Sequence, residues 1–228
     1  MSNSNLSRRA VIGGVLATGA AMTSMSWAAP LHAQGLGLSS ILGKASDSAL
    51  DKLARPGAFY GDEDVRIGLP FIGRSSGLLG SLFGGVSRLG LLDGFIRTLN
   101  SAAGTAAGEA KPIFRTAIDD LSFSDVPAIA RNNDGGTRYL RQSSNDALHG
   151  KLDPLVDSAL GDLGAHSQLE SLNRKYSWLA AAGLDRRGLT NTVTDQGLDG
   201  IFTYLGREEA AFRKNPLGNV GGILGEIF

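Results

Sequence analysis

The amino-acid sequence predicts an all-α protein: a single compact domain of about seven helices, with one irregular, partly extended excursion near residues 56–72. Three observations predict this fold class. Apolar residues recur three and four positions apart over most of the chain after residue 36, which is the period of an α-helix. Helix-starting residues and Gly/Pro turns separate these segments. No unit repeats at a fixed period.

Each expected helix carries an apolar stripe that would face a core. In chain order, the stripes run through residues 91–99, 113–121, 152–163, 169–179 and 198–212. The stripe over 152–163 is the most regular, because its aspartates all fall off the apolar face. Its proline, Pro154, is expected in the first turn of a helix, where the missing N–H is tolerated.

Polar residues and turns indicate where these helices begin and end. Helix starts are expected at Ser124-Asp125, at Asn145-Asp146 and at Thr192–Asp195, the last of which resembles a capping box with Asp in place of Glu. The cluster Asn132–Gly136 predicts a turn. Asn215-Pro216 predicts the end of the last long helix.

The excursion near residues 56–72 contains the one segment that reads as extended. This segment is "DVRIGLPFI", residues 64–72, and it follows turns at Pro56-Gly57 and Gly61-Asp62. We therefore expect it to interrupt the helices without forming a sheet.

The N-terminus has the three parts of a cleaved export signal. Arg8-Arg9 precede an uncharged apolar stretch over residues 10–22, and small residues then offer cleavage near Ala33 or Ala28. A membrane anchor would need about 20 strongly apolar residues. The pattern predicts a twin-arginine-type signal and a periplasmic protein, with the general secretory route left open.

The chain then divides into a signal peptide over 1–33, a helical domain over 34–216 and a Gly-rich tail over 217–228. Its 22 basic and 22 acidic residues balance, so the sequence lacks the basic surface that nucleic-acid binding requires. It contains no cysteine, which excludes disulfides, thiolate metal sites and a catalytic thiol.

No cofactor or metal is predicted. A helical metal pair needs two histidines four residues apart, whereas His149 and His166 are much farther apart along the chain. We expect both to be surface histidines.

The segment "GRSSG", residues 73–77, matches the G-x-S-x-G nucleophile elbow and would make Ser75 a hydrolase nucleophile. The elbow works on a parallel sheet, whereas helices are expected downstream. With 32 glycines in the chain, a chance match is favoured over a serine hydrolase.

Residues 73–94 are unusually rich in glycine, which weakens a helix by about 1 kcal/mol per residue relative to alanine. Close packing against a neighbouring helix is the favoured explanation. The alternative is a peripheral membrane protein whose residues 73–94 contact lipid or a hydrophobic partner. The charges of Arg74 and Arg88 exclude a membrane span here.

Two charged segments are candidate sites. Glu208 and Glu209 could share acid and base roles, but Glu209 and Arg213 have the spacing of a surface ion pair on a helix, and a solvated face is favoured. Arg138 and Arg141 could bind a carboxylate or phosphate, although pairing with an acidic residue of a neighbouring helix is commoner.

Several motifs together resemble the bacterial exported proteins of domain-of-unknown-function family 4197. They are "RPGAF" (55–59), "VRIGLP" (65–70), "AKPIF" (110–114), "TRYLRQSS" (137–144) and "VTDQGLDGIFTYLGREEAAFRKNP" (193–216). The resemblance implies an all-helical exported domain and no known activity. The family usually has Arg-Arg-Thr-Thr where this chain has Arg141-Gln-Ser-Ser, so the resemblance implies weaker anion binding here. The family's first long helix is charged, unlike residues 73–88.

We therefore expect a non-enzymatic periplasmic protein that binds an unknown hydrophobic ligand, an envelope component or a protein partner. The family motifs are polar where pure packing motifs would be apolar, so their polar residues form the candidate site. These are Tyr139, Arg141, Asp199, Glu208, Glu209 and Arg213. If they form one cluster, Arg141 should lie within ion-pair distance of Asp199 or Glu208.

Overall fold

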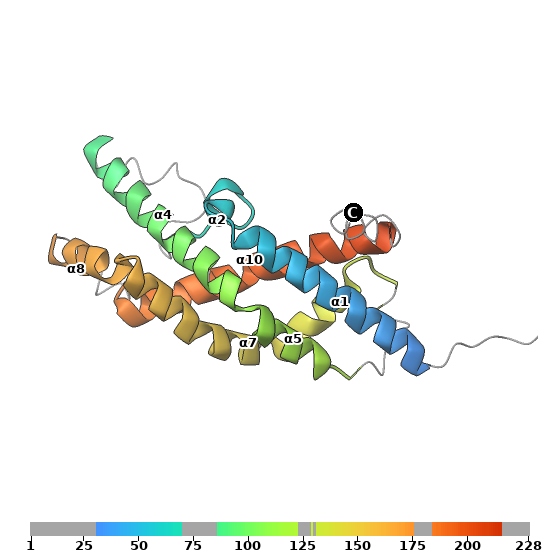
Figure 1. The fold of residues 1–228 in the computed structure, drawn as a ribbon. Helices are drawn as coiled ribbons and strands as arrows, with labels where there is room; N and C mark the ends of the chain where they lie inside the picture. The colour runs from blue at the N-terminus through green and yellow to red at the C-terminus, as the bar shows by residue number, and fades with distance from the viewer. Residues whose placement is uncertain (1–30, 70–85, 123–128, 130, 176–183, 216–228) are drawn as a thin grey trace, which may run out of the picture.

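The computed structural model describes residues 31–69, 86–122, 129, 131–175 and 184–215, and within them it contains seven helices and no strand (Figure 1). The predicted all-α fold is therefore confirmed. The helices, labelled as in Figure 1, are α1 (Leu31–Leu53), α2 (Ala58–Gly61), α4 (Val86–Glu109), α5 (Lys111–Asp119), α7 (Gly135–Asp162), α8 (Ala165–Lys175) and α10 (Arg186–Lys214).

The helices pack into one elongated bundle in which α10 makes its most extensive contacts with α1 and α7 (Figure 1). The start of α4 and the short helix α8 lie at one end of the bundle, and the start of α1 lies at the other. The last turns of α10 approach the first turn of α7. Polar residues of both helices therefore lie close together where these two helix ends meet.

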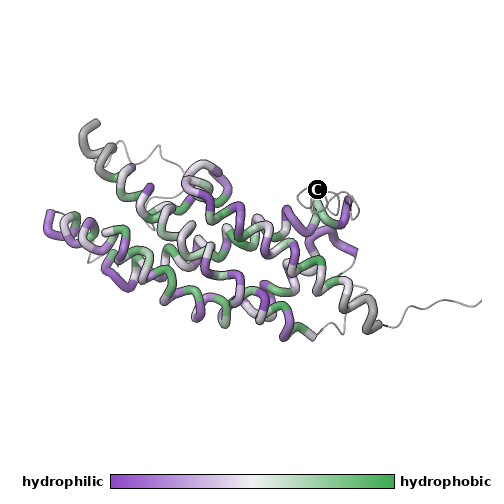
Figure 2. The backbone as a smooth tube through the Cα atoms, viewed as in Figure 1, coloured by the Kyte–Doolittle hydropathy of each residue, from purple (hydrophilic) through white to green (hydrophobic). Residues whose placement is uncertain are grey.

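A single apolar core runs along the bundle and draws on every helix. Phe114 of α5 packs edge-to-face on Phe202 of α10, with ring centroids 6.1 Å apart. Each fully buried side chain of this size contributes roughly 1.5–3 kcal/mol by leaving water. Figure 2 shows hydrophobic and hydrophilic residues alternating along the helices, with hydrophilic stretches on α8 and around the end of α10.

The second half of α4 buries alanines where other helices bury larger side chains, and these small residues allow close packing. At Gly104 the backbone of α1 approaches so closely that a Cβ atom would lie 3.2 Å from the carbonyl oxygen of Leu53. The glycine and alanine content of this helix thus reflects helix–helix contact.

Helix α7 runs without interruption through a predicted boundary. The expected start at Asn145-Asp146 is wrong, because both residues lie in the interior of α7. Pro154 also lies inside this helix and not in its first turn. A proline here removes one hydrogen bond to the carbonyl of Gly150. Gly150 is exposed, so water can bond to that carbonyl.

Helix α10 begins six residues earlier than the predicted capping box at Thr192–Asp195. Its N-cap is Asp185, whose carboxylate accepts a 2.7 Å hydrogen bond from the backbone N–H of Gly188. The hydroxyl of Thr192 instead donates to the carbonyl of Gly188 within the helix, at 2.8 Å. The predicted end is confirmed, since Asn215 is the C-cap.

The excursion consists of α2 and the irregular segment 62–69, while residues 70–72 lie outside the described part of the chain. Val65, Ile67 and Leu69 are buried and alternate with less buried residues, as in a strand. The partly extended excursion is therefore present over the described residues.

Two side-chain amides bind this segment in the way that a neighbouring strand would. Asn100 of α4 accepts from the N–H of Ile67 at 2.8 Å and donates to its carbonyl at 2.9 Å. Gln196 of α10 does the same for Gly68, at 2.9 and 3.0 Å. These four bonds satisfy backbone groups that burial would otherwise leave unpaired.

Replacing Asn100 by alanine should destabilise the protein by about 2–3 kcal/mol, because the buried N–H and carbonyl of Ile67 lose their partner. The midpoint of urea unfolding measures the loss. Thr105→Ala on the same helix is the matched control, since Thr105 is exposed and should change stability by no more than about 0.5 kcal/mol. Equal stability of the two variants would mean that the amide does not hold the excursion.

Candidate functional site

The six candidate residues lie on two helices, Tyr139 and Arg141 on α7 and the other four on α10. The structure places them in four different settings. Their contacts differ in burial and in the helix that they reach, so some of these residues hold the fold and others are open to a ligand.

Arg141 and Asp199 form an ion pair between α7 and α10. Their side chains are 50% and 48% exposed, so the pair adds little to stability. The guanidinium of Arg141 also lies over the ring of Phe202, 5.4 Å from its centroid. Of the two partners expected for Arg141, Asp199 is the one observed.

Glu208 faces α1 and belongs to a different surface. Its carboxylate accepts hydrogen bonds from Lys52 Nζ at 2.5 Å and from Ser48 Oγ at 2.7 Å. The residue therefore joins α10 to α1. It is not part of one cluster with Arg141.

Glu209 is fully buried, at 0% exposed, which corrects the prediction of a solvated surface pair. Its carboxylate accepts hydrogen bonds from the N–H groups of Gly136 (3.0 Å) and Thr137 (2.7 Å) and from the Thr137 hydroxyl (2.7 Å). Arg213 donates to it from Nε at 2.9 Å and from Nη2 at 2.7 Å. The expected spacing of Glu209 and Arg213 is present, but the pair lies inside the bundle.

The position of Glu209 has a physical reason. The first N–H groups of a helix have no partner within the helix, and the helix dipole places positive charge there. Glu209 brings a negative charge to the first turn of α7 from another helix. A Cβ atom at Gly136 would lie 2.9 Å from Glu209 Oε1 and 3.0 Å from Leu42, so this contact requires glycine.

Tyr139 points towards the chain that follows α5. Its hydroxyl donates a 2.6 Å hydrogen bond to the carbonyl of Ser122. This contact ties the first turns of α7 to the segment after α5 and lies apart from the Arg141–Asp199 pair.

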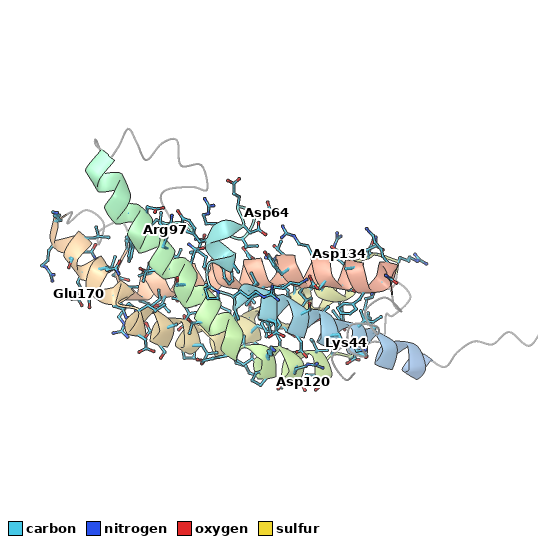
Figure 3. All side chains as sticks on the ribbon, turned by 45° about the horizontal axis from the view of Figure 1, so that its top comes forward. Lys44, Asp64, Arg97, Asp120, Asp134 and Glu170 are labelled. Carbon is cyan, nitrogen blue, oxygen red and sulfur yellow. The ribbon has the colours of Figure 1, made fainter. Side chains whose placement is uncertain are left out.

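A groove of about 500 Å³ lies between the first turns of α7 and the last turns of α10, and sequence reasoning did not find it. We call it the α7–α10 groove. Figure 3 labels Asp134 at its rim, beside α10. The groove is lined by Asn133, Asp134, Thr137, Arg138, Arg141, Phe202, Thr203, Gly206, Arg207 and Ala210.

Three arginines line the groove, and their ion pairs differ. Arg138 donates from Nε to Asp134 at 3.0 Å. Arg207 donates from Nη1 to Asp62 at 2.7 Å and from Nη2 to Asp64, both in the excursion. The hydrogen bond from Arg207 is the main reason why the pKa of Asp62 is lowered, with the N–H of Asp64 and the hydroxyl of Tyr204 also contributing. Arg207 is therefore held in place by the excursion.

The lining suits the binding of an anion better than acid–base chemistry. Its one carboxylate is Asp134, and no histidine or second carboxylate lines this groove to share a proton with it. Arg138 and Arg141 belong to the segment that the sequence suggested as an anion site. Arg207 was overlooked, because its partners lie far away along the chain.

A second polar cluster joins α7, α8 and α10 around Asp157. Asp157 accepts hydrogen bonds from Arg186 Nη2 (2.7 Å) and from the Thr190 hydroxyl (2.9 Å), and the Arg186 bond is the main cause of its lowered pKa. His166 Nε2 lies 3.4 Å from the same carboxylate. His166 is only 12% exposed, so its prediction as a surface histidine is wrong.

His149 is the other histidine expected at the surface. It is half-buried on α7, with Nε2 3.1 Å from Asp195 Oδ1 on α10. Among the residues that the structure describes, no group of three or more His, Cys, Asp or Glu side chains could hold a metal ion.

Two sequence hypotheses fall mainly on residues that the structure does not describe. Ser75 lies there, and so does the Gly-rich segment up to residue 85; residues 86–94 form the start of α4. No helix in the described ranges is long and apolar enough to cross a membrane. Leu163 is a large hydrophobic side chain that is exposed, at 43%.

A protein-family model described as "Protein of unknown function (DUF4197)" matches residues 32–228. No curated protein and no solved structure shows significant similarity to the chain.

Replacing Glu209 by glutamine should cost about 3 kcal/mol of stability, because the first turn of α7 and Arg213 lose a buried negative charge. Glu208→Gln is the matched control at the neighbouring position and should cost about 1 kcal/mol, since Lys52 is solvent-accessible. Chemical denaturation measures both. A Glu209→Gln variant no less stable than Glu208→Gln would contradict the assigned role.

His166 should make the protein less stable in mild acid. Burial lowers its pKa in the folded state below the usual 6.5, with the charge of Arg186 adding to the effect. Below about pH 6.5 the unfolded chain therefore binds the proton more readily, and the free energy of unfolding falls.

The measurement is urea unfolding from pH 7.5 to pH 5, in the wild type and in His166→Gln. The variant should lose less stability over this range than the wild type. His149→Gln is the control and should keep the part of the slope that is due to His166. Identical pH dependence in His166→Gln and the wild type would refute the prediction.

Proposed function

Because the chain belongs to the DUF4197 family, whose description assigns no function, we propose one from its own residues: it is an exported, non-enzymatic helical protein that binds a ligand in the α7–α10 groove. The observation that carries this proposal is a groove of about 500 Å³ with three arginines in its lining.

Export is proposed from the N-terminus. Arg8-Arg9 and the uncharged stretch over 10–22 are typical of a twin-arginine-type signal, which would direct the protein to the periplasm. The family match begins at residue 32, next to the predicted cleavage site at Ala33, which supports a boundary there. These features favour a folded domain that works outside the cytoplasm.

Ligand binding is proposed from the size and lining of the groove. Pockets that bind small molecules usually have volumes of about 300–1,000 Å³ and combine apolar walls with a few polar groups. The α7–α10 groove combines Phe202 and Ala210 with arginine, threonine and asparagine side chains. A ligand with both an apolar part and a polar group fits this lining, which makes the hydrophobic ligand expected from the sequence more specific.

The test is native mass spectrometry of protein isolated from the periplasmic fraction of its source cells. The wild type should carry a bound small molecule that Thr203→Trp loses, because a tryptophan at this exposed position of the lining fills the groove without changing its charge. Thr116→Trp is the matched control and should keep the ligand. Like Thr203, Thr116 is exposed, and its hydroxyl bonds to a carbonyl four residues earlier in its own helix.

Two outcomes would contradict the proposal. Recovery of the protein only from the cytoplasm, with residues 1–33 still attached, would exclude export. If the Thr203→Trp variant still carries the bound molecule, the binding site lies elsewhere. If the wild-type protein carries no bound molecule, the proposal of a ligand is wrong.

A further inference from the structure

We propose that the α7–α10 groove binds a small organic anion, a carboxylate or a phosphate monoester with an apolar body. This inference rests on the proposed function, which makes the groove a binding site. It adds the chemical class of the ligand and names the side chains that would recognise it.

The lining of the groove is rich in arginine. Four ionisable side chains line the groove, of which Arg138, Arg141 and Arg207 are positive and Asp134 is negative. The arginines also pair with Asp199, Asp62 and Asp64 outside the lining, so recognition of an anion depends on the N–H groups that the arginines still offer and not on an excess of positive charge. Arginine is also the side chain whose planar group best fits the two oxygens of a carboxylate or phosphate.

Arg138 and Arg141 still have N–H groups that can donate to a ligand. A guanidinium has five N–H donors. Within the described ranges Arg138 uses Nε for Asp134, and Arg141 uses Nη2 for Asp199. The two residues are three positions apart on α7, so their side chains project from the same side of the helix. Both are exposed, so an anion can reach them from solvent.

Arg207 has a different role from Arg138 and Arg141. Each of its two terminal nitrogens already donates a hydrogen bond, to Asp62 and to Asp64, and its guanidinium lies 5.0 Å from the ring centre of Tyr204. It adds positive charge at one side of the groove and is held too firmly to follow a ligand. We therefore assign recognition of the anionic group to Arg138 and Arg141.

The groove also has room for an apolar part of the ligand. Phe202 lies in the lining, and the guanidinium of Arg141 lies over its ring. Gly206 and Ala210 have little or no side chain, and they leave the space that the groove occupies. Phe202 is only 3% exposed and lies under Arg141, so an apolar body would lie over Gly206 and Ala210 while its anionic end meets the arginines.

The carboxylates around the groove limit the size and the total charge of the ligand. Asp134, Asp199, Asp62 and Asp64 all pair with the lining arginines and so stand around the groove. A long polyanion such as a nucleic acid would meet these carboxylates and be repelled. A single anionic group at Arg138 and Arg141 lies near Asp134 and Asp199 alone, and so meets less repulsion than a polyanion would.

The experiment is an NMR titration of the full chain labelled with nitrogen-15, using four probes of similar size. Phenyl phosphate and benzoate are anionic, benzyl alcohol is neutral and benzylamine is cationic. The two anions should shift the backbone amide signals of the lining residues in a saturable way, whereas benzyl alcohol and benzylamine should not. The stronger of the two anions identifies the phosphate or the carboxylate as the recognised group.

The variants assign the effect to the two arginines. Arg138→Gln and Arg141→Gln should each weaken binding of the stronger anion at least about tenfold, as the loss of a hydrogen bond to a charged group does. Arg187→Gln is the matched control, an exposed arginine in the first turn of α10, and should bind like the wild type. Thermal unfolding confirms that the variants fold.

The outcomes separate this inference from the proposed function. Binding of benzyl alcohol or benzylamine at the lining residues, without the anions, would keep the groove as a binding site and overturn the anion. Anion binding that shifts other residues, or that Arg138→Gln and Arg141→Gln leave unchanged, would also overturn it. If none of the four probes binds in the groove, the anion inference is wrong. The proposed function is still tested separately, by native mass spectrometry of the protein isolated from the periplasmic fraction.

Discussion

The structure depends on one buried charge, the carboxylate of Glu209. An ionised carboxylate removed from water is costly unless donors surround it, and here the first turn of α7, the Thr137 hydroxyl and Arg213 provide them. This requirement fixes where the end of α10 meets the start of α7. The α7–α10 groove lies beside the same meeting point, so its arginines occupy positions set by a residue that is itself closed to solvent.

Periodicity predicted the elements of the fold well and their boundaries poorly. The apolar stripes over 91–99 and 198–212 lie in helices, and the stripe over 113–121 lies in α5 except for its last two residues, because a helix that packs on one side must repeat its apolar residues. The false starts at Asn145 and Thr192 have one cause. Residues that cap helices also occur inside them, where Thr192 satisfies its hydroxyl on a carbonyl of its own helix.

The candidate site was only partly within reach of the sequence. Arg141 and Asp199 meet as anticipated, whereas Glu209 was assigned to the surface because its spacing to Arg213 is that of an exposed pair. What buries it is contact with a helix start some seventy residues earlier, which no local pattern records. Gly135-Gly136 at that start was the available signal, since α7 begins there with residues that have no side chain and can be approached closely.

The extended segment over 65–69 also bears on how this protein behaves among its own copies. An apolar extended chain with unpaired backbone groups is a template for strand pairing between molecules. Here Asn100 and Gln196 already occupy the hydrogen-bonding groups of Ile67 and Gly68, and the apolar side chains face the core. The helical bundle can thus contain a strand-like segment whose central residues offer no edge for aggregation.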